Sequence, residues 1–131
     1  MNPYILVVDD DSIAAQLISR TVNNLGLDIQ VAGDGAEALE LIKAHPPQLI
    51  LMDLKMPGMD GFELLSHLRG HVPASSIPLI IVTSIDQPEL LMMPGVCRVF
   101  IKSKYHPEEL REAAAELLAE AKQRRAARMS I

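Results

Sequence analysis

Short apolar segments alternate along this chain with longer stretches whose apolar positions recur at helical spacing. Five segments, at residues 4–8, 28–32, 48–52, 79–83 and 99–101, have the length and character of strands. Most of them are continuously apolar, which is typical of parallel strands that are covered on both faces of a sheet. The alternation predicts five βα units and an α/β fold.

Helical stretches follow the first three strand segments. We expect Ser12 to cap the first helix and Gly26 to end it. The second helix is expected at residues 36–45, where a pair of prolines terminates it, and the third at residues 62–69. Helical spacing predicts these inward-facing residues: Ile13, Leu17, Ile18 and Leu25 in the first helix, and Phe62, Leu65 and Leu68 in the third.

The fourth helical stretch is irregular. Pro88 and Pro94 bracket only residues 89–93, barely more than one turn, so a shortened fourth helix is predicted. The last helix is expected to begin near Pro107, and its basic end at residues 122–128 suits the negative pole of the helix dipole. We expect one domain over residues 1–121, followed at residues 122–131 by a basic helix end or the start of a linker.

Three carboxylates follow two of the predicted strands: Asp9 and Asp10 after the first, and Asp53 after the third. Parallel strands end at one edge of a sheet, where ligands of open α/β sheets bind. Crowded like charges are unfavourable there unless a cation neutralises them, and a hard divalent cation with oxygen ligands does so. The sequence therefore predicts a Mg²⁺ site, with the Thr83 hydroxyl and the Lys102 ammonium beside it.

This set of groups could accept a phosphoryl group. Phosphoryl transfer depends mainly on positioning and electrostatics, which Mg²⁺, a hydroxyl and a lysine supply together. In this hypothesis Asp53 is the nucleophile, Asp9 and Asp10 hold the metal, Thr83 donates a hydrogen bond to the acyl phosphate, and Lys102 is its counter-ion.

Composition narrows the function classes. The chain has 131 residues, a formal net charge of -5 and a pI near 5.3, which argues against a nucleic-acid or anionic-membrane binder. Cys97 is the only cysteine, so neither an internal disulfide nor a thiolate metal site is expected. The N-terminus leads straight into a strand rather than a signal peptide, and no apolar run could span a bilayer. We therefore expect the protein to reside in the reducing cytoplasm.

Four sequence words, Ile-Leu-Val-Val-Asp-Asp-Asp, Leu-Met-Asp-Leu-Lys-Met-Pro-Gly-Met-Asp-Gly, Ile-Val-Thr-Ser and Phe-Ile-Lys, resemble those of the receiver domain of two-component response regulators. The resemblance runs to about Leu118. It implies a flavodoxin-like (βα)5 fold, a doubly wound five-stranded parallel sheet in the order 2-1-3-4-5. It also implies Mg²⁺-dependent phosphorylation of Asp53 by a sensor histidine kinase or phosphotransfer protein, a metal shell completed by the Lys55 carbonyl, and a switch read by an output partner.

The position of the family's lysine has two interpretations. Counting from Gly95 selects Lys102, whereas counting back from Pro107 lands on Ser103, which leaves Lys104 as a competitor. The family's aromatic switch residue would be Val99 if Lys102 is the lysine. Phe100 would be the aromatic switch residue only under the shifted register, which places the lysine position at Ser103.

The favoured hypothesis is a phosphorylation-dependent protein-binding switch that turns over no metabolite. One alternative is a non-phosphorylated pseudo-receiver that acts as an interaction scaffold, motivated by the shortened fourth helix. The other is a small phosphatase resembling the haloacid-dehalogenase class, which carries a second Asp where this chain has Lys55. Residues 90–93 offer an apolar surface for a homodimer, and the arginines near the C-terminus are expected to be solvated.

Overall fold

A computed structural model describes residues 2–70 and 76–129, and five parallel strands within these ranges form one sheet in the order β2-β1-β3-β4-β5. The order confirms the doubly wound, flavodoxin-like topology. The strands are β1 (Tyr4–Val8), β2 (Asp28–Ala32), β3 (Leu49–Met52), β4 (Leu79–Thr83) and β5 (Val96–Ile101). Because β1 pairs with both β2 and β3, the strand order reverses beside β1, where such sheets bind their ligands.

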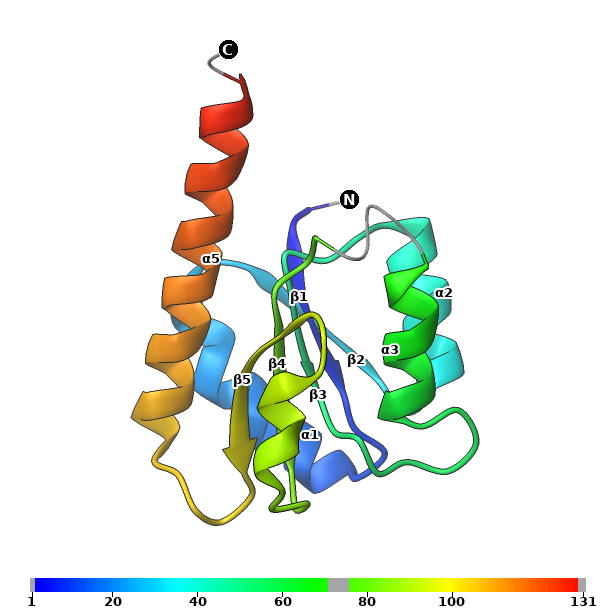
Figure 1. The fold of residues 1–131 in the computed structure, drawn as a ribbon. Helices are drawn as coiled ribbons and strands as arrows, with labels where there is room; N and C mark the ends of the chain where they lie inside the picture. The colour runs from blue at the N-terminus through cyan, green and yellow to red at the C-terminus, as the bar shows by residue number, and fades with distance from the viewer. Residues whose placement is uncertain (1, 71–75, 130–131) are drawn as a thin grey trace.

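Helices cover both faces of the sheet (Figure 1). They are α1 (Ser12–Val22), the short 3₁₀ helix η1 (Asn23–Leu25), α2 (Gly35–Ala44), α3 (Gly61–Arg69), the 3₁₀ helix η2 (Pro88–Met92) and α5 (Pro107–Met129). Alternate residues of β1, β3 and β4 enter two apolar clusters: one packs beneath α2, α3 and η2, the other beneath α1 and α5. Burial on both faces accounts for the continuously apolar strands.

The first helix differs from the prediction at its start and on its inward face. Asp11, not Ser12, is the N-cap, because its side chain accepts hydrogen bonds from the backbone N–H groups of Ile13 at 3.0 Å and Ala14 at 3.3 Å. Ile13 and Leu17 are 69% and 59% exposed, so their assignment to the core was wrong. Ile18 is buried as predicted, together with Ala15 and Val22.

Phe62 is a second correction. It is 42% exposed, whereas the expected inward residues Leu65 and Leu68 are buried together with Leu64. The start of α3 is pressed against the chain that follows β3, since a Cβ at Gly61 would lie 2.6 Å from the Asp53 carbonyl oxygen. Position 61 therefore faces the body of the protein and position 62 faces away from it.

The segment before β5 has the predicted irregularity. Only η2 occupies it, with Leu90 buried and Leu91 and Met92 exposed. β5 begins at Val96, three residues earlier than its apolar run suggested, and a register shift relative to β4 lies between Leu79 and Ile80. As an edge strand, β5 tolerates Arg98, which pairs with Glu116 of α5 at 3.4 Å.

The final helix begins at Pro107 as predicted and continues through the basic residues to Met129. Its last turns project beyond the sheet (Figure 1). The domain boundary at residue 121 stays a prediction, and residues 130–131 of the proposed tail lie outside the described residues. Across the described ranges, none of the helices has the combination of length and hydropathy that crossing a bilayer requires.

Candidate functional site

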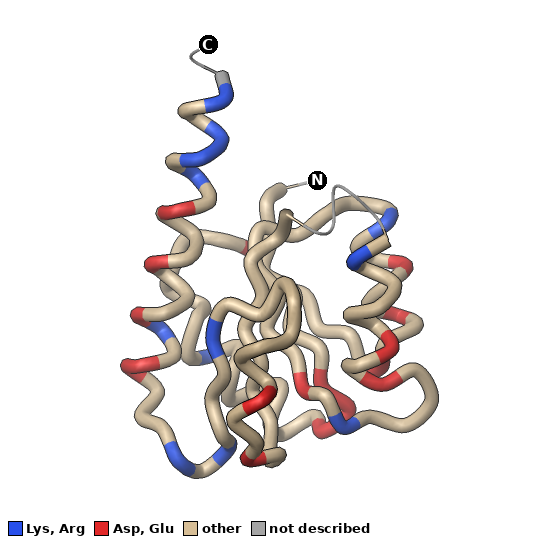
Figure 2. Tube along the Cα trace, viewed as in Figure 1, with Lys and Arg blue, Asp and Glu red and all other residues tan. Residues whose placement is uncertain are grey.

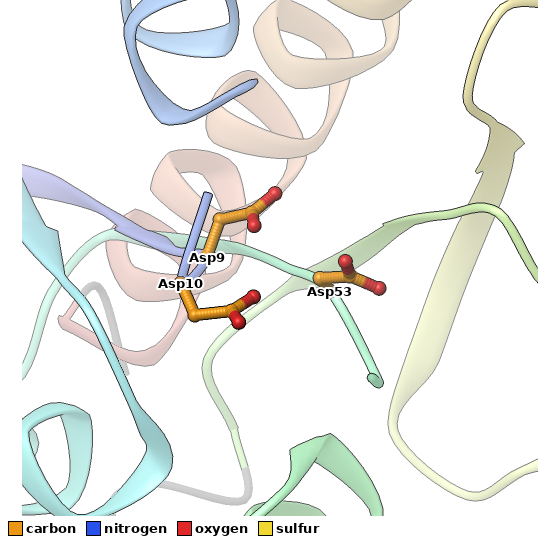
Figure 3. A group of neighbouring side chains, drawn as sticks. All are labelled: Asp9, Asp10 and Asp53. Carbon is orange, nitrogen blue, oxygen red and sulfur yellow. The ribbon is translucent and has the colours of Figure 1, made fainter. Parts of the chain in front are cut away.

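Asp9, Asp10 and Asp53 lie together at the carboxyl end of the sheet. β1 and β3 are parallel neighbours, so the residues that follow them meet, and one carboxylate oxygen from each acid lies within 4.8 Å of the other two. Figure 3 shows the three carboxylates grouped at the ends of these strands. Asp9 is 2% and Asp53 6% exposed, whereas Asp10 is open to solvent. Two buried carboxylates and an exposed one form the acidic part of the site.

Backbone hydrogen bonds hold the two buried acids in place. The N–H of Asp9 donates to Ala32 O at 3.1 Å and that of Asp53 to Val8 O at 2.9 Å, which extends the strand ladders by one residue. Asp9 Oδ1 also accepts from the Asp11 N–H at 2.9 Å, and Asp53 Oδ1 from the Lys55 N–H at 3.2 Å. One oxygen of each carboxylate is therefore engaged by the backbone, and the other is available to a cation.

Lys102 is that cation in this structure. Its Nζ donates to Asp9 Oδ2 and to Asp53 Oδ2, both at 2.9 Å, and its backbone N–H donates to Thr83 O at 2.8 Å. Lys104 instead pairs at 3.0 Å with Asp86, on the exposed surface. Of the two competing lysines, the fold brings Lys102 into the acidic cluster.

The protonation equilibria reflect this crowding. Burial raises the pKa of Asp9, and this outweighs the opposing effect of its hydrogen bonds from Lys102 and the Asp11 backbone. For Lys102, burial alone would lower the pKa, but hydrogen bonds to Asp53 and Asp9 raise it overall. The Lys102 ammonium is therefore firmly protonated, and its hydrogen bond offsets only part of the cost of burying the Asp9 charge.

Thr83 ends β4, which lies between the strands that carry Asp53 and Lys102. It is fully buried, and its Oγ1 accepts a hydrogen bond from the Ile85 N–H at 3.3 Å. Lys55 follows Asp53 in the adjoining loop with an exposed side chain. The roles of the Thr83 hydroxyl and the Lys55 carbonyl stay predictions.

Gly61 is a site residue that the sequence reasoning missed. Its N–H donates to Leu54 O at 3.0 Å, and its lack of a side chain lets α3 approach the backbone of Asp53. Asp60 caps the same helix by accepting from the Glu63 N–H at 2.9 Å. An Asp-Gly pair directly after the acidic loop was the available signal.

The two candidates for the aromatic switch position occupy different faces of the sheet. Val99 packs against the cluster beneath α2 and α3, whereas Phe100 packs on the α1 and α5 side. Phe100 contacts Tyr105 edge-on, with ring centroids 5.3 Å apart. The aromatic pair beside Lys102 therefore faces α1 and α5.

The donor set suits a hard divalent cation. Carboxylate oxygens from Asp9, Asp10 and Asp53 are close enough to share one ion, and oxygen ligands are those that Mg²⁺ prefers. Asp9 and Asp53 both contact Lys102, and Asp53 follows β3, the strand beside the one that ends in Thr83. A group bonded to an Asp53 oxygen would have a cation, an ammonium and a hydroxyl-bearing strand end around it, the surroundings that stabilise a phosphoryl group.

Comparison with known proteins gives a consistent picture. The family model described as "Response regulator receiver domain" matches residues 5–118. The DNA-binding response regulator MtrA of Mycobacterium tuberculosis is 32% identical over 112 residues, which cover 84% of this chain and 48% of that protein. The response regulator MprA of the same species is 35% identical over 86 residues, 66% of this chain and 36% of that protein. This chain spans about half or less of the length of these curated relatives.

Solved structures show the same fold. The receiver domain of the Francisella response regulator 1452 is 34% identical, with a TM-score of 0.80 over 91% of this chain and 98% of that one. A CheY-like response regulator receiver domain protein from Methanospirillum hungatei JF-1 is 27% identical, with a TM-score of 0.81 over 95% and 99% of the two chains.

Proposed function

This chain belongs to the response regulator receiver family of two-component systems, and on that premise we propose that it is a phosphorylation-dependent switch whose acceptor is Asp53. The observation that carries the proposal is the position of the Asp53 side chain, which is shared between the acidic cluster and the Lys102 ammonium. We further propose that it binds proteins and turns over no metabolite.

The proposed reaction transfers a phosphoryl group from a donor histidine to Asp53. The P–N bond to the histidine breaks, and a P–O bond to an Asp53 carboxylate oxygen forms. Bound Mg²⁺ would neutralise charge on the transferred group. Asp9, Asp10, Asp53 and the Lys55 carbonyl would hold the ion, while Lys102 and the Thr83 hydroxyl bind the remaining phosphoryl oxygens.

Phosphorylation of Asp53 would change the contacts of Lys102. Its ammonium now bridges Asp9 and Asp53 at 2.9 Å, and a phosphoryl group on Asp53 would present it with new anionic oxygens. The Lys102 backbone N–H donates a hydrogen bond to Thr83 O at the end of β4, so movement of Lys102 would also displace the sheet edge formed by β4 and β5. We propose that this edge carries the difference between the two states to an output partner.

The donor protein needs a surface beside Asp53. α1 offers Ile13 and Leu17, both exposed, next to a crevice of about 380 Å³ that Leu17 shares with Lys102 and Tyr105. Exposed apolar residues beside a reactive group are typical of a docking site. We propose that a sensor histidine kinase or phosphotransfer protein approaches along α1.

The test is a ¹H-¹⁵N NMR titration of the wild-type chain and Asp53→Asn, first with Mg²⁺ and then with beryllofluoride, a mimic of the acyl phosphate. We expect Mg²⁺ to shift resonances of residues 9, 10 and 53. Beryllofluoride should extend the shifts to Thr83, Lys102 and β5 in the wild type only. Phosphorylation by acetyl phosphate, followed by intact-protein mass, provides the covalent readout.

An unchanged spectrum after both additions, with no mass increase, would overturn the proposal in favour of the non-phosphorylated scaffold. Sustained phosphate release from generic phosphomonoesters would instead favour the phosphatase alternative.

A further inference from the structure

The residues on the inward face of α5 change from apolar to basic where the helix leaves the body of the protein. Its buried residues recur at helical spacing and are all apolar: Leu110, Ala113, Ala114, Leu117 and Ala121. The same spacing continued along the helix reaches Arg124, Arg125 and Arg128. Three guanidinium groups therefore extend the stripe that packs against the sheet.

These arginines line a crevice of about 400 Å³ at the amino-terminal edge of the sheet, opposite the acidic site. Its other wall includes Pro46 and Pro47 before β3 and Pro78 before β4. We call this feature the arginine crevice. Among the described residues, no carboxylate lies within ion-pair distance of its three guanidinium groups. The crevice has guanidinium groups on one side, and on the other the three prolines and Ile77 with the polar residues Gln48 and Ser76.

The helix dipole explains only part of this arrangement. Cations are favourable in the last turns of any helix, whichever way they face, and Lys122 on another face of α5 meets that need as well. Arg124 and Arg128 are four residues apart, a spacing at which like charges repel. Their position on one crevice concentrates positive charge there, which suits an anionic ligand.

We propose that the arginine crevice binds an extended acidic segment of a partner protein. Two or more carboxylates of that segment would pair with Arg124, Arg125 and Arg128, while its apolar side chains lie on the prolines. The planar guanidinium group binds carboxylates with two parallel hydrogen bonds, which gives such pairs direction as well as charge. This inference does not depend on phosphorylation of Asp53.

The charge distribution favours a short acidic protein segment over nucleic acid. Residues 122–131 hold four of the 12 Lys and Arg and none of the 17 Asp and Glu, so the rest of the chain carries a net charge of -9. Figure 2 shows the basic residues in the C-terminal turns of α5 and acidic residues along the preceding turns. A continuous phosphate backbone laid along the helix would meet Glu116 and Glu120, whereas a short segment in the crevice avoids them.

The test measures fluorescence anisotropy of a labelled peptide of alternating glutamate and valine, titrated with the full chain at low and moderate salt. The affected variant is Arg124→Gln/Arg128→Gln. The matched control is Arg20→Gln/Lys122→Gln, which removes the same charge from residues that do not line the crevice. A glutamine–valine peptide and a thymidine oligonucleotide are the comparison probes, and circular dichroism checks that both variants fold.

We expect the glutamate peptide to bind the wild type and the control within about twofold of each other, and the crevice variant at least about tenfold more weakly, because charge-assisted hydrogen bonds are lost. The glutamine peptide should not bind. Equal losses in both variants would overturn the proposal, since the effect would then be one of net charge. Tighter binding of the oligonucleotide, or no saturable binding of the glutamate peptide, would overturn it too.

Discussion

The two edges of this parallel sheet handle charge in opposite ways. At the carboxyl edge, Asp9 and Asp53 are buried and share Lys102, so each charge depends on its neighbours. At the amino edge, the arginines of α5 are exposed on a helix that extends past the body. Buried charges require partners to be stable, whereas exposed charges are stabilised by water. The carboxyl edge should therefore be energetically sensitive to single substitutions, and the amino edge tolerant of them.

The largest effect should come from Lys102→Met. Removing the ammonium leaves two buried carboxylates without their shared cation, and we expect the free energy of unfolding to fall by about 3 kcal/mol. The measurement is urea unfolding at neutral pH without Mg²⁺. Lys104→Met is the matched control, with a change within about 0.5 kcal/mol because its pair with Asp86 is exposed. Equal losses in the two variants would mean that the acidic cluster is not coupled to Lys102.

Gly61→Ala should have the second-largest effect on the free energy of unfolding. The new Cβ would lie 2.6 Å from Asp53 O and 2.7 Å from the Leu54 Cα, and backbone atoms cannot move away without shifting α3. We expect a loss of about 2 kcal/mol in the free energy of unfolding. Gly70→Ala, at the other end of α3, is the control, because the nearest atom to its Cβ would be 3.8 Å away and its φ is -78°. A stable Gly61→Ala protein would show that the close approach at the carboxyl edge is dispensable.

Tyr4→Phe probes a buried polar group at the amino edge. The Tyr4 hydroxyl donates to His45 O at 2.6 Å, and losing this bond should cost about 1 kcal/mol. Burial raises the pKa of Tyr4, so the folded protein holds the phenolic proton more tightly than the unfolded chain does. Its contribution is complete below about pH 10 and is lost as the pH rises through the higher folded-state pKa.

Alkaline unfolding curves measure this second effect. Above about pH 10, the stability of Tyr4→Phe should fall less steeply than that of the wild type. Tyr105 and Lys102 also have raised pKa values and keep part of the slope in the variant. Parallel curves for the two proteins would contradict the assignment.

Arg125→Gln should have the smallest effect. It removes an exposed cation at the amino edge, so the free energy of unfolding should change by no more than about 0.5 kcal/mol, chiefly through the helix dipole. Thermal unfolding by circular dichroism is sufficient to check this. A loss comparable to that of Lys102→Met would remove the distinction between the two edges.

Most of the fold could be predicted from local sequence patterns. The first four strand segments, the irregular stretch between Pro88 and Pro94 and the final helix from Pro107 were predicted correctly, whereas β5 begins three residues before its predicted start. Apolar runs and proline act over a few residues whatever surrounds them. The grouping of Asp9, Asp10 and Asp53 followed in the same way. Residues that end neighbouring parallel strands must meet at one edge, so strand assignment alone brought these acids together.

Which way a side chain faces was decided only by tertiary packing. Ile13, Leu17 and Phe62 have helical spacing suited to a core, yet all three are exposed, whereas Ala15 and Gly61 of the same helices are buried. Lys102 and Lys104 were both candidates from spacing, and the pairing of β5 with β4 determined which one reaches the acids. The orientation of the arginines likewise depends on where α5 leaves the sheet. Periodicity identifies a stripe on an element, but only contacts between elements determine what that stripe faces.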